Sequence, residues 1–135
     1  METNQLTGFA TQYTAAWCSQ DAARVAAHFA PQGSLTINGG APAVGRAAIA
    51  ASAQQFMTNF PDLVVALDSL NVQDDRAVYR WTLGGTNSGP GGTGKAVRFS
   101  GYEEWTMGAD GLIAESRGYF DEAEYGRQVK DGVPV

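Results

Sequence analysis

The clearest pattern in the chain is a pair of alternating apolar and polar runs between residues 97 and 121. An Asp-Gly pair separates the runs, which is typical of a β-hairpin with a tight turn. If Asp110 and Gly111 are the two loop residues, one face of the hairpin is apolar or small except for Ser116 and Glu103. That face is predicted to pair Met107 with Ala114, Trp105 with Ser116, Glu103 with Gly118 and Gly101 with Phe120. Glu103 is therefore predicted to be a carboxyl group on an inward face.

The opposite face of the hairpin is polar and aromatic. It is predicted to pair Glu104 with Arg117, as a structural charge pair, and Tyr102 with Tyr119. A neighbouring strand adds Arg80 to the same surface. Because so aromatic a face is unfavourable in water, we expect it to join two copies of the chain as a homodimer.

Three helices are predicted before the strands, from apolar residues that recur at three- and four-residue spacing. They cover residues 3–19, a short segment that follows a cap at Ser19 or Asp21 and ends before Pro31, and residues 46–59. Tyr13 lies in the middle of the apolar stripe of the first helix. Its ring should point inward, and its buried hydroxyl then needs a hydrogen-bond partner.

Short strands are predicted at residues 34–38, 63–70 and 76–83, in addition to the two arms of the hairpin. The segment 84–95 is rich in glycine and is predicted to be a mobile loop. It lacks the GxxxxGK[ST] pattern and leads into a strand, which disfavours a phosphate-binding loop.

This order of elements predicts an α+β fold in a single domain spanning residues 1–135. Three N-terminal helices pack on one face of a strongly curved mixed or antiparallel sheet, as a cone-shaped α+β barrel. We expect a pocket between the helices and the sheet, suited to a small apolar molecule. The candidate substrate-binding residues are Trp17, Phe56, Trp81, Trp105, Gly118 and Phe120.

Composition narrows the range of partners. The net charge is -5, and the 9 Lys and Arg residues are scattered, so a nucleic-acid partner is not expected. The longest apolar runs are far too short to cross a membrane, and no basic segment precedes an apolar one at the start, so we expect a cytoplasmic protein. With 1 His and 1 Cys, the chain offers little to bind a transition metal, and we expect no metal and no cofactor.

Several short motifs occur in a characteristic order along the chain. They are YTAAW at 13–17 followed by Asp21, HFAP at 28–31, GRAAI at 45–49, GTNSGP at 85–90, FSG at 99–101 and DGLIAE at 110–115. In this order and spacing the sequence resembles the nuclear transport factor 2 superfamily, specifically SnoaL-like polyketide cyclases and, more distantly, ketosteroid isomerases. The resemblance covers nearly the whole chain and implies a cone built on a curved sheet, usually in a homodimer.

The resemblance also implies two candidate catalytic residues. Tyr13 matches the isomerase tyrosine that donates a hydrogen bond to the developing enolate oxygen, and Glu103 matches the protonated carboxylic acid beside it. In ketosteroid isomerase an apolar site keeps that acid neutral so that it can donate. The general base of the isomerases falls near Ile37 or Asn38, and neither side chain can remove a proton from carbon.

The cyclase machinery is altered as well. The catalytic aspartate of the cyclases matches Gly118, and their pocket histidine matches Glu103 or Glu104. Asp121 is predicted to face outward by strand parity, so it becomes a candidate base only if a bulge follows Gly118.

Three functions agree with these residues. The protein is an isomerase, cyclase or lyase that stabilises an enolate on an apolar cyclic or polyketide-like substrate, or a non-catalytic binder of a small hydrophobic ligand, or a protein of this fold with a closed core in which Tyr13 and Glu103 satisfy each other. In an enzyme Glu103 is either a hydrogen-bond donor or the base, because burial raises the pKa of a carboxyl group. A cavity beside Glu103 would separate these hypotheses.

Overall fold

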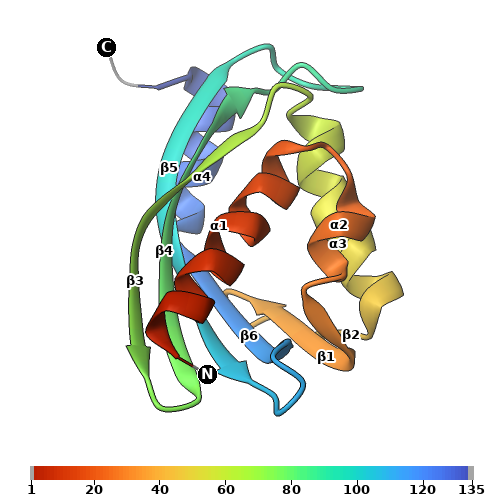
Figure 1. The fold of residues 1–135 in the computed structure, drawn as a ribbon. Helices are drawn as coiled ribbons and strands as arrows, with labels where there is room; N and C mark the ends of the chain where they lie inside the picture. Colours follow the sequence, from red (N-terminus) through yellow and green to blue (C-terminus); the bar gives the residue numbers. More distant parts are fainter. Residues whose placement is uncertain (1, 134–135) are drawn as a thin grey trace.

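The computed structural model describes residues 2–133, in which four helices accompany one sheet of six strands (Figure 1). The elements are α1 (Thr3–Cys18), α2 (Ala22–Ala26), β1 (Phe29–Ile37), β2 (Ala43–Val44), α3 (Arg46–Asn59), β3 (Val64–Gln73), β4 (Arg76–Thr86), β5 (Ala96–Met107), β6 (Ile113–Phe120) and α4 (Glu122–Asp131). No helix within residues 2–133 has the length and apolar character needed to cross a bilayer.

The sheet is mixed and open, which confirms the predicted α+β class. Its strand order is β2-β1-β6-β5-β4-β3, and β1 runs parallel to β6 while the other neighbours are antiparallel. The long strands curve around α1, and α2 and α3 lie on the same concave side (Figure 1). Side chains that point to this concave side therefore meet the helices.

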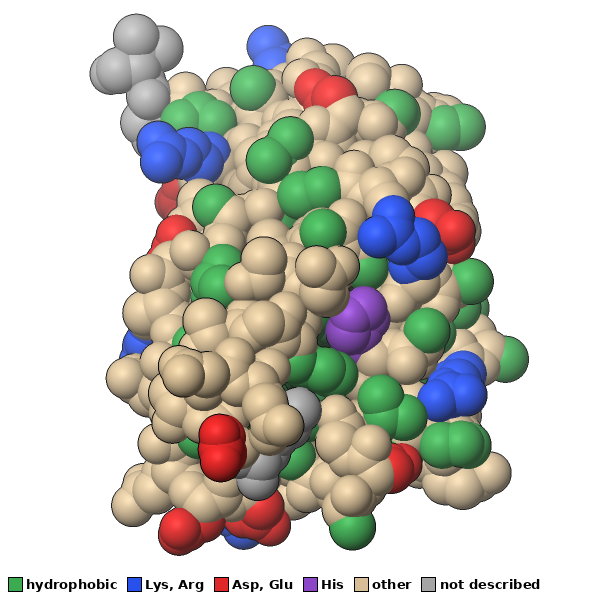
Figure 2. All heavy atoms as spheres, in the orientation of Figure 1, with side chains coloured by type: hydrophobic (Ala, Val, Ile, Leu, Met, Phe, Trp, Pro, Cys, Tyr) green, Lys and Arg blue, Asp and Glu red, His purple; other side chains and the backbone are tan. Residues whose placement is uncertain are grey.

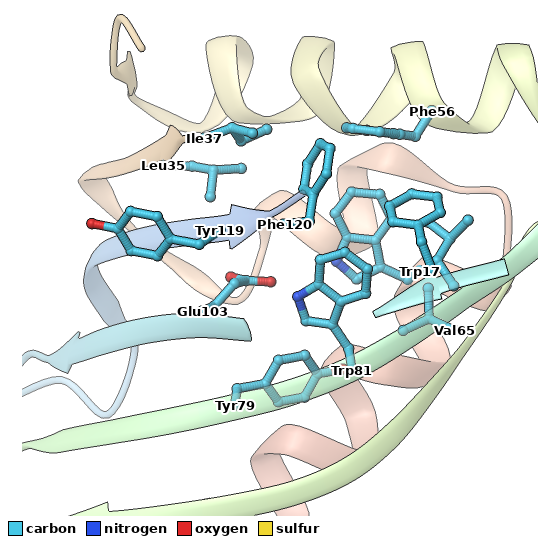
Figure 3. A pocket seen from close by; sticks show the side chains of 13 residues that line it. Trp17, Leu35, Ile37, Phe56, Val65, Tyr79, Trp81, Glu103, Tyr119 and Phe120 are labelled. Atoms are coloured by element: carbon cyan, nitrogen blue, oxygen red, sulfur yellow. The ribbon is translucent and has the colours of Figure 1, made fainter. Parts of the chain in front are cut away.

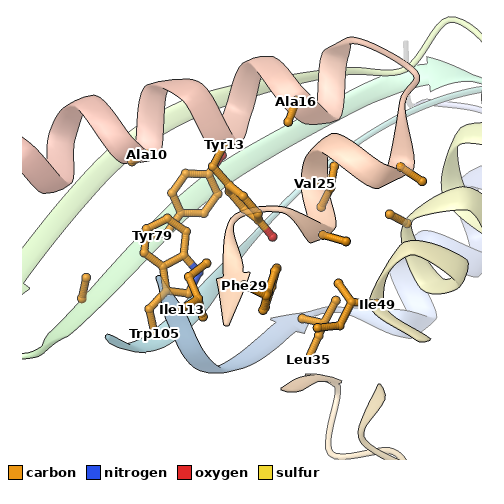
Figure 4. Close-up of a cluster of buried hydrophobic side chains, with 14 of the residues drawn as sticks. Ala10, Tyr13, Ala16, Val25, Phe29, Leu35, Ile49, Tyr79, Trp105 and Ile113 are labelled. Carbon is orange, nitrogen blue, oxygen red and sulfur yellow. The ribbon is translucent and has the colours of Figure 1, made fainter. Parts of the chain in front are cut away.

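The amphipathic pattern of α1 places its apolar stripe against the sheet. Leu6, Ala10, Tyr13 and Ala16, spaced by four and three residues, are buried. Figure 4 shows Tyr13 reaching from α1 toward the side chains of the strands, with Tyr79 and Trp105 around it. The predicted inward direction of Tyr13 is confirmed.

The predicted hairpin register is confirmed over most of its length. Glu103 lies opposite Gly118, Trp105 opposite Ser116, and Gly101 opposite Phe120. The two-residue turn is wrong, because a register shift after Thr106 pairs Met107 with Ile113, and residues 108–112 form the loop.

The hydrogen bonds of this loop explain the difference. The backbone N–H of Gly108 donates to the carbonyl oxygen of Leu112 at 2.9 Å, and the Asp110 side chain accepts from the N–H of Leu112 at 3.0 Å. The Asp-Gly pair therefore lies inside a wider loop, in which Gly111 adopts a φ of 77°.

The segment after α2 is a strand where the sequence predicted helix. β1 begins at Phe29 and contains both Pro31 and Gly33. The register between β1 and β6 shifts between Phe29 and Ser34, and such an irregularity tolerates a proline that cannot donate to the ladder. A Cβ at Gly33 would lie 2.8 Å from the Ile113 carbonyl oxygen, so this close crossing requires glycine.

Helix α4 was not predicted. Asp121, placed on a strand from the sequence, caps this helix and accepts a hydrogen bond from the Glu124 N–H at 3.0 Å. Tyr125 then packs its ring against Phe56 of α3 and Phe99 of β5. The acid at position 121 with an acid three residues later is a helix-start signal that the strand interpretation overlooked.

Two smaller expectations also differ from the structure. Residues 84–86 were assigned to the glycine-rich loop but extend β4, where they pair with residues 96–98 of β5. Glu104 does lie opposite Arg117, yet the ion pair of Arg117 is with Glu115 on its own strand, at 3.3 Å. Both partners of that pair are largely exposed, so it contributes little to stability.

On the face in Figure 2, charges of both signs are scattered among small apolar groups.

Candidate functional site

A cavity lies between α1, α3 and the concave face of the sheet (Figure 3). Its volume is about 60 Å³, which is room for several water molecules or one compact organic molecule. The residues that line it are Trp17, Leu35, Ile37, Phe56, Val65, Tyr79, Trp81, Leu83, Phe99, Glu103, Gly118, Tyr119 and Phe120. Among these, Glu103 alone carries a carboxyl group, so the chemistry of the cavity centres on it.

Three side chains hold the Glu103 carboxyl group. Its Oε1 accepts hydrogen bonds from the Ser116 hydroxyl at 2.7 Å and from the Trp105 indole N–H at 3.0 Å. The Tyr13 hydroxyl lies 3.0 Å from Oε1 and 3.1 Å from Oε2. Among residues 2–133, Oε2 therefore has Tyr13 as its one partner, and a carboxylate oxygen can accept more than one hydrogen bond. Oε1 is committed to the protein, and Oε2 keeps capacity for a ligand.

Strand register explains why these groups meet. Ser116 and Trp105 form the cross-strand pair next to that of Glu103 and Gly118, and all point to the concave side. A Cβ at Gly118 would lie 3.6 Å from the Glu103 Cγ, in ordinary contact. Because Gly118 has no side chain, the space beside Glu103 stays open as part of the cavity.

Burial dominates the electrostatics of this carboxyl group. Glu103 is 7% exposed, and its removal from water raises its pKa above the ordinary value of 4.5. The hydrogen bonds from Ser116, Trp105 and Tyr13 act in the opposite direction, since they favour the charged form, but burial prevails. A raised pKa of this kind suits a group that gives and takes protons.

Tyr13 is held in its protonated form. Burial raises its pKa well above 10.0, and the negative charge of Glu103 raises it further. Its hydroxyl is therefore a permanent donor to Glu103. Tyr13 is fully buried and does not line the cavity, so its contact is with Glu103 and not with a ligand.

Of the other predicted site residues, five line the cavity and one lies in the core. Trp17, Phe56, Trp81, Gly118 and Phe120 line the cavity with Glu103. Trp105, expected in the wall, is 1% exposed and lies outside the lining. It stacks on Tyr79 at 4.8 Å between ring centroids and donates its indole N–H to Glu103. Strand alternation predicts its inward face correctly, but its indole packs in the core and not in the cavity wall.

The alternative bases do not approach Glu103. Ile37 lines the cavity with an apolar side chain, and Asn38 binds the Phe120 N–H and the Glu122 carboxylate, each at 2.9 Å. Asp121 caps α4, which contradicts its placement by a bulge as the base. Among residues 2–133 that line the cavity, no second carboxyl group supplements Glu103.

Ser116 is a site residue whose role was not foreseen. It is fully buried and makes the shortest hydrogen bond to Glu103. Its signal was present in the sequence, because Ser116 and Glu103 are the two polar exceptions on one face of the hairpin, one cross-strand pair apart.

Comparison with known families gives a match over most of the chain. Residues 10–116 match the family model of the SnoaL-like domain. No curated protein matched the chain.

Solved structures share the fold at low sequence identity. A protein provisionally assigned as a SnoaL-like polyketide cyclase from Jannaschia sp. CCS1 has 19% identity and a TM-score of 0.83, with 96% of this chain and 94% of that one covered. TsrD from Streptomyces laurentii has 22% identity and a TM-score of 0.83, with coverages of 96% and 97%. A hypothetical protein with a ketosteroid isomerase-like fold from Catenulispora acidiphila DSM 44928, in complex with trimethylamine, has 17% identity and a TM-score of 0.80, with coverages of 93% and 97%.

Proposed function

Because the chain belongs to the SnoaL-like domain family, we propose that it binds a compact apolar cyclic molecule and exchanges a proton with it at Glu103. The reaction class is that of an isomerase, cyclase or lyase that passes through an enolate. One observation carries the proposal: the cavity has a single carboxyl group, whose Oε1 is committed to the protein while Oε2 retains capacity.

The support around Glu103 suits proton transfer. The hydrogen bonds from Ser116 and Trp105 to Oε1 fix the orientation of the carboxyl group. Oε2 is therefore already positioned for a ligand, and binding does not have to order the side chain. Its raised pKa brings the carboxyl group closer to the working pH, where removing and returning a proton are both feasible. Glu103 is then the base, and the missing bases of the resembled families are not needed.

The walls of the cavity suit a ring compound. Trp17, Phe56, Trp81 and Phe120 supply aromatic surfaces, and Leu35 and Ile37 supply aliphatic ones. The small volume favours a compact ligand. The related protein from Catenulispora acidiphila was crystallised with a small molecule, trimethylamine, which supports this size class.

A non-catalytic binder is the second candidate, because the positions of both expected bases carry no acid here. They are occupied by Ile37, Asn38 and Gly118. A closed core is disfavoured, since a cavity adjoins Glu103 and Tyr13 does not line it.

One nuclear magnetic resonance experiment separates these candidates. Cyclohexanone is incubated in D₂O with the wild type and with Glu103→Gln, and saturation transfer and replacement of the α-protons by deuterium are followed together. In Glu103→Gln the amide oxygen accepts from Ser116 and Trp105 and the amide nitrogen donates to Tyr13, so the fold is kept. The matched control is Glu104→Gln, on the same strand but exposed.

We expect binding by all three proteins, with enzyme-dependent exchange in the wild type and Glu104→Gln and none in Glu103→Gln. Binding without exchange by the wild type would favour the non-catalytic binder. Exchange that survives in Glu103→Gln, or no binding at all, would contradict the proposal.

A further inference from the structure

Trp81 carries an indole N–H that makes no hydrogen bond within residues 2–133. The Trp105 indole donates to Glu103, whereas the Trp81 N–H has no acceptor among residues 2–133. No fully buried side-chain nitrogen or oxygen in that range lacks a partner, so the Trp81 N–H is accessible. Trp81 lines the cavity, and in Figure 3 its indole nitrogen is turned toward Glu103. A molecule in the cavity can therefore reach both groups.

Strand pairing fixes this arrangement. Tyr79 lies opposite Glu103, and Trp81 lies opposite Gly101, so Trp81 and Glu103 are diagonal neighbours on the concave face. Diagonal neighbours on adjacent antiparallel strands are about 7 to 8 Å apart, within reach of long side chains. The two side chains can bracket a small ligand from β4 and β5.

Gly101 determines where the indole lies. A Cβ at this position would clash with the Tyr119 carbonyl oxygen and would lie 2.6 Å from the Trp81 Cζ2, on the indole edge that carries the N–H. The absence of a side chain at Gly101 lets that edge lie over β5, on the strand that bears Glu103. Gly101 therefore leaves room for the Trp81 indole over β5.

We propose that the Trp81 indole N–H receives the carbonyl oxygen of the ligand while Glu103 Oε2 faces the adjacent carbon, so that the substrates are compact cyclic ketones with an acidic α C–H. This inference rests on the proposed function and adds the substrate class and the group that binds its oxygen. The resemblance to isomerases assigns the oxygen to Tyr13, but Tyr13 is fully buried and does not line the cavity.

The chemical step is a balanced proton transfer. Glu103 Oε2 removes a proton from the carbon beside the carbonyl group, the C–H electron pair forms a C=C bond, and the carbonyl π pair moves to oxygen. The Trp81 N–H donates to the resulting enolate oxygen, where charge develops. Glu103 then returns the proton to the same carbon or to another carbon of a conjugated system, and nothing is oxidised or reduced.

The test compares two ligands of nearly the same shape. Cyclohexanone has a carbonyl oxygen, and methylenecyclohexane has a CH₂ group in its place. Their dissociation constants are measured for the wild type, Trp81→Phe and Trp17→Phe, together with α-deuteration of the ketone. Both variants keep an aromatic ring and remove an indole N–H from a residue that lines the cavity, so Trp17→Phe is the matched control.

We expect Trp81→Phe to weaken cyclohexanone binding about tenfold relative to methylenecyclohexane and to slow exchange by about a hundredfold, because a donor to the developing charge is lost. Trp17→Phe should weaken both ligands alike. A parallel loss of both ligands in Trp81→Phe, with exchange unaffected, overturns the inference. If exchange still depends on Glu103 in that case, the proposed function stands. If the wild type binds neither ligand, both proposals fail.

Discussion

The hydroxyl of Tyr13 lies 3.0 Å and 3.1 Å from the two carboxyl oxygens of Glu103, and both residues are buried. This geometry makes Tyr13 a brace for Glu103. The carboxyl group accepts hydrogen bonds from Tyr13, Trp105 and Ser116, and Glu103 also borders the cavity. The protein therefore holds the Glu103 carboxyl group in a fixed position at the edge of the cavity, which is the physical basis for the proposed function.

Removing the Tyr13 hydroxyl should lower the stability of the protein and raise the pKa of Glu103. Tyr13→Phe deletes a buried donor, and we expect the free energy of unfolding to fall by about 1 to 3 kcal/mol. Because this hydrogen bond lowers the pKa of Glu103, that pKa should rise further in the variant. Chemical denaturation measures the first effect, and carbon-13 NMR of the glutamate carboxyl groups measures the second.

Tyr79→Phe is the control for this prediction. The Tyr79 hydroxyl bonds to Thr14, not to Glu103, so its loss should affect stability without moving the Glu103 titration. An equal shift of the Glu103 pKa in both variants would contradict a specific role for Tyr13.

The stability of the protein should depend on pH through Glu103. A carboxyl group whose pKa is raised in the folded state is favourable below its unfolded pKa, and this contribution is lost as the pH rises through the folded pKa. The melting temperature of the wild type relative to Glu103→Gln should therefore decrease as the pH rises from about 4 toward the folded pKa. Thermal melts of both proteins across this range provide the measurement, and a constant difference would refute a raised pKa.

Gly118 tests the openness of the space beside Glu103. Gly118→Asp places a second acid with its Cβ in contact with the Glu103 Cγ, so like-charge repulsion should raise one of the two pKa values steeply and the side chain should fill part of the cavity. We expect weaker cyclohexanone binding in titration calorimetry. Gly126→Asp is the matched control, since a Cβ there meets no atom within 4 Å. Equal behaviour of the two variants would argue against the assigned position of the cavity.

The convex face of the sheet remains our proposed dimer interface. Strand alternation turns the ring of Tyr119 to this face, although the residue also borders the cavity. The rings of Tyr102 and Tyr119 lie 5.2 Å apart, and the Arg80 guanidinium lies 5.2 Å from the Tyr102 ring centre. We expect light scattering to show a dimer at micromolar concentration and Tyr102→Glu to shift it toward monomer. A monomeric wild type would remove this proposal.

Much of the fold was predictable because strand and helix periodicities were strong. The register that pairs Glu103 with Gly118 follows from alternation alone, and the bounds of α3 follow from its apolar spacing and the proline after it. The Asp110-Gly111 pair misled because a turn dipeptide fixes a change of direction but not the length of the loop around it. Helix α4 was missed because Asp121 was read as the next strand position.

The sequence predicts the residue at the centre of the site, but not the directions of the side chains around it. Alternation showed that Glu103 faces inward, but which oxygen is free depends on Ser116 and Trp105, whose side-chain directions arise only in the packed core. Helical spacing likewise indicated that Tyr13 points inward, without showing that it would bond to Glu103 and lie outside the cavity lining. A sequence pattern shows which face of an element a side chain lies on, whereas its hydrogen-bond partners depend on how the elements pack together.

The central claim is that Glu103 is a carboxyl group with a raised pKa that a ligand in the cavity contacts. The most direct test is a pH titration of the Glu103 carboxyl carbon by NMR, with and without saturating cyclohexanone, in which Glu103→Gln identifies the Glu103 signal by its loss. We predict a Glu103 pKa above 4.5 that rises further with the ketone, because the ligand displaces water without donating to the carboxylate. An ordinary Glu103 titration, or one that the bound ketone leaves unchanged, would contradict the account.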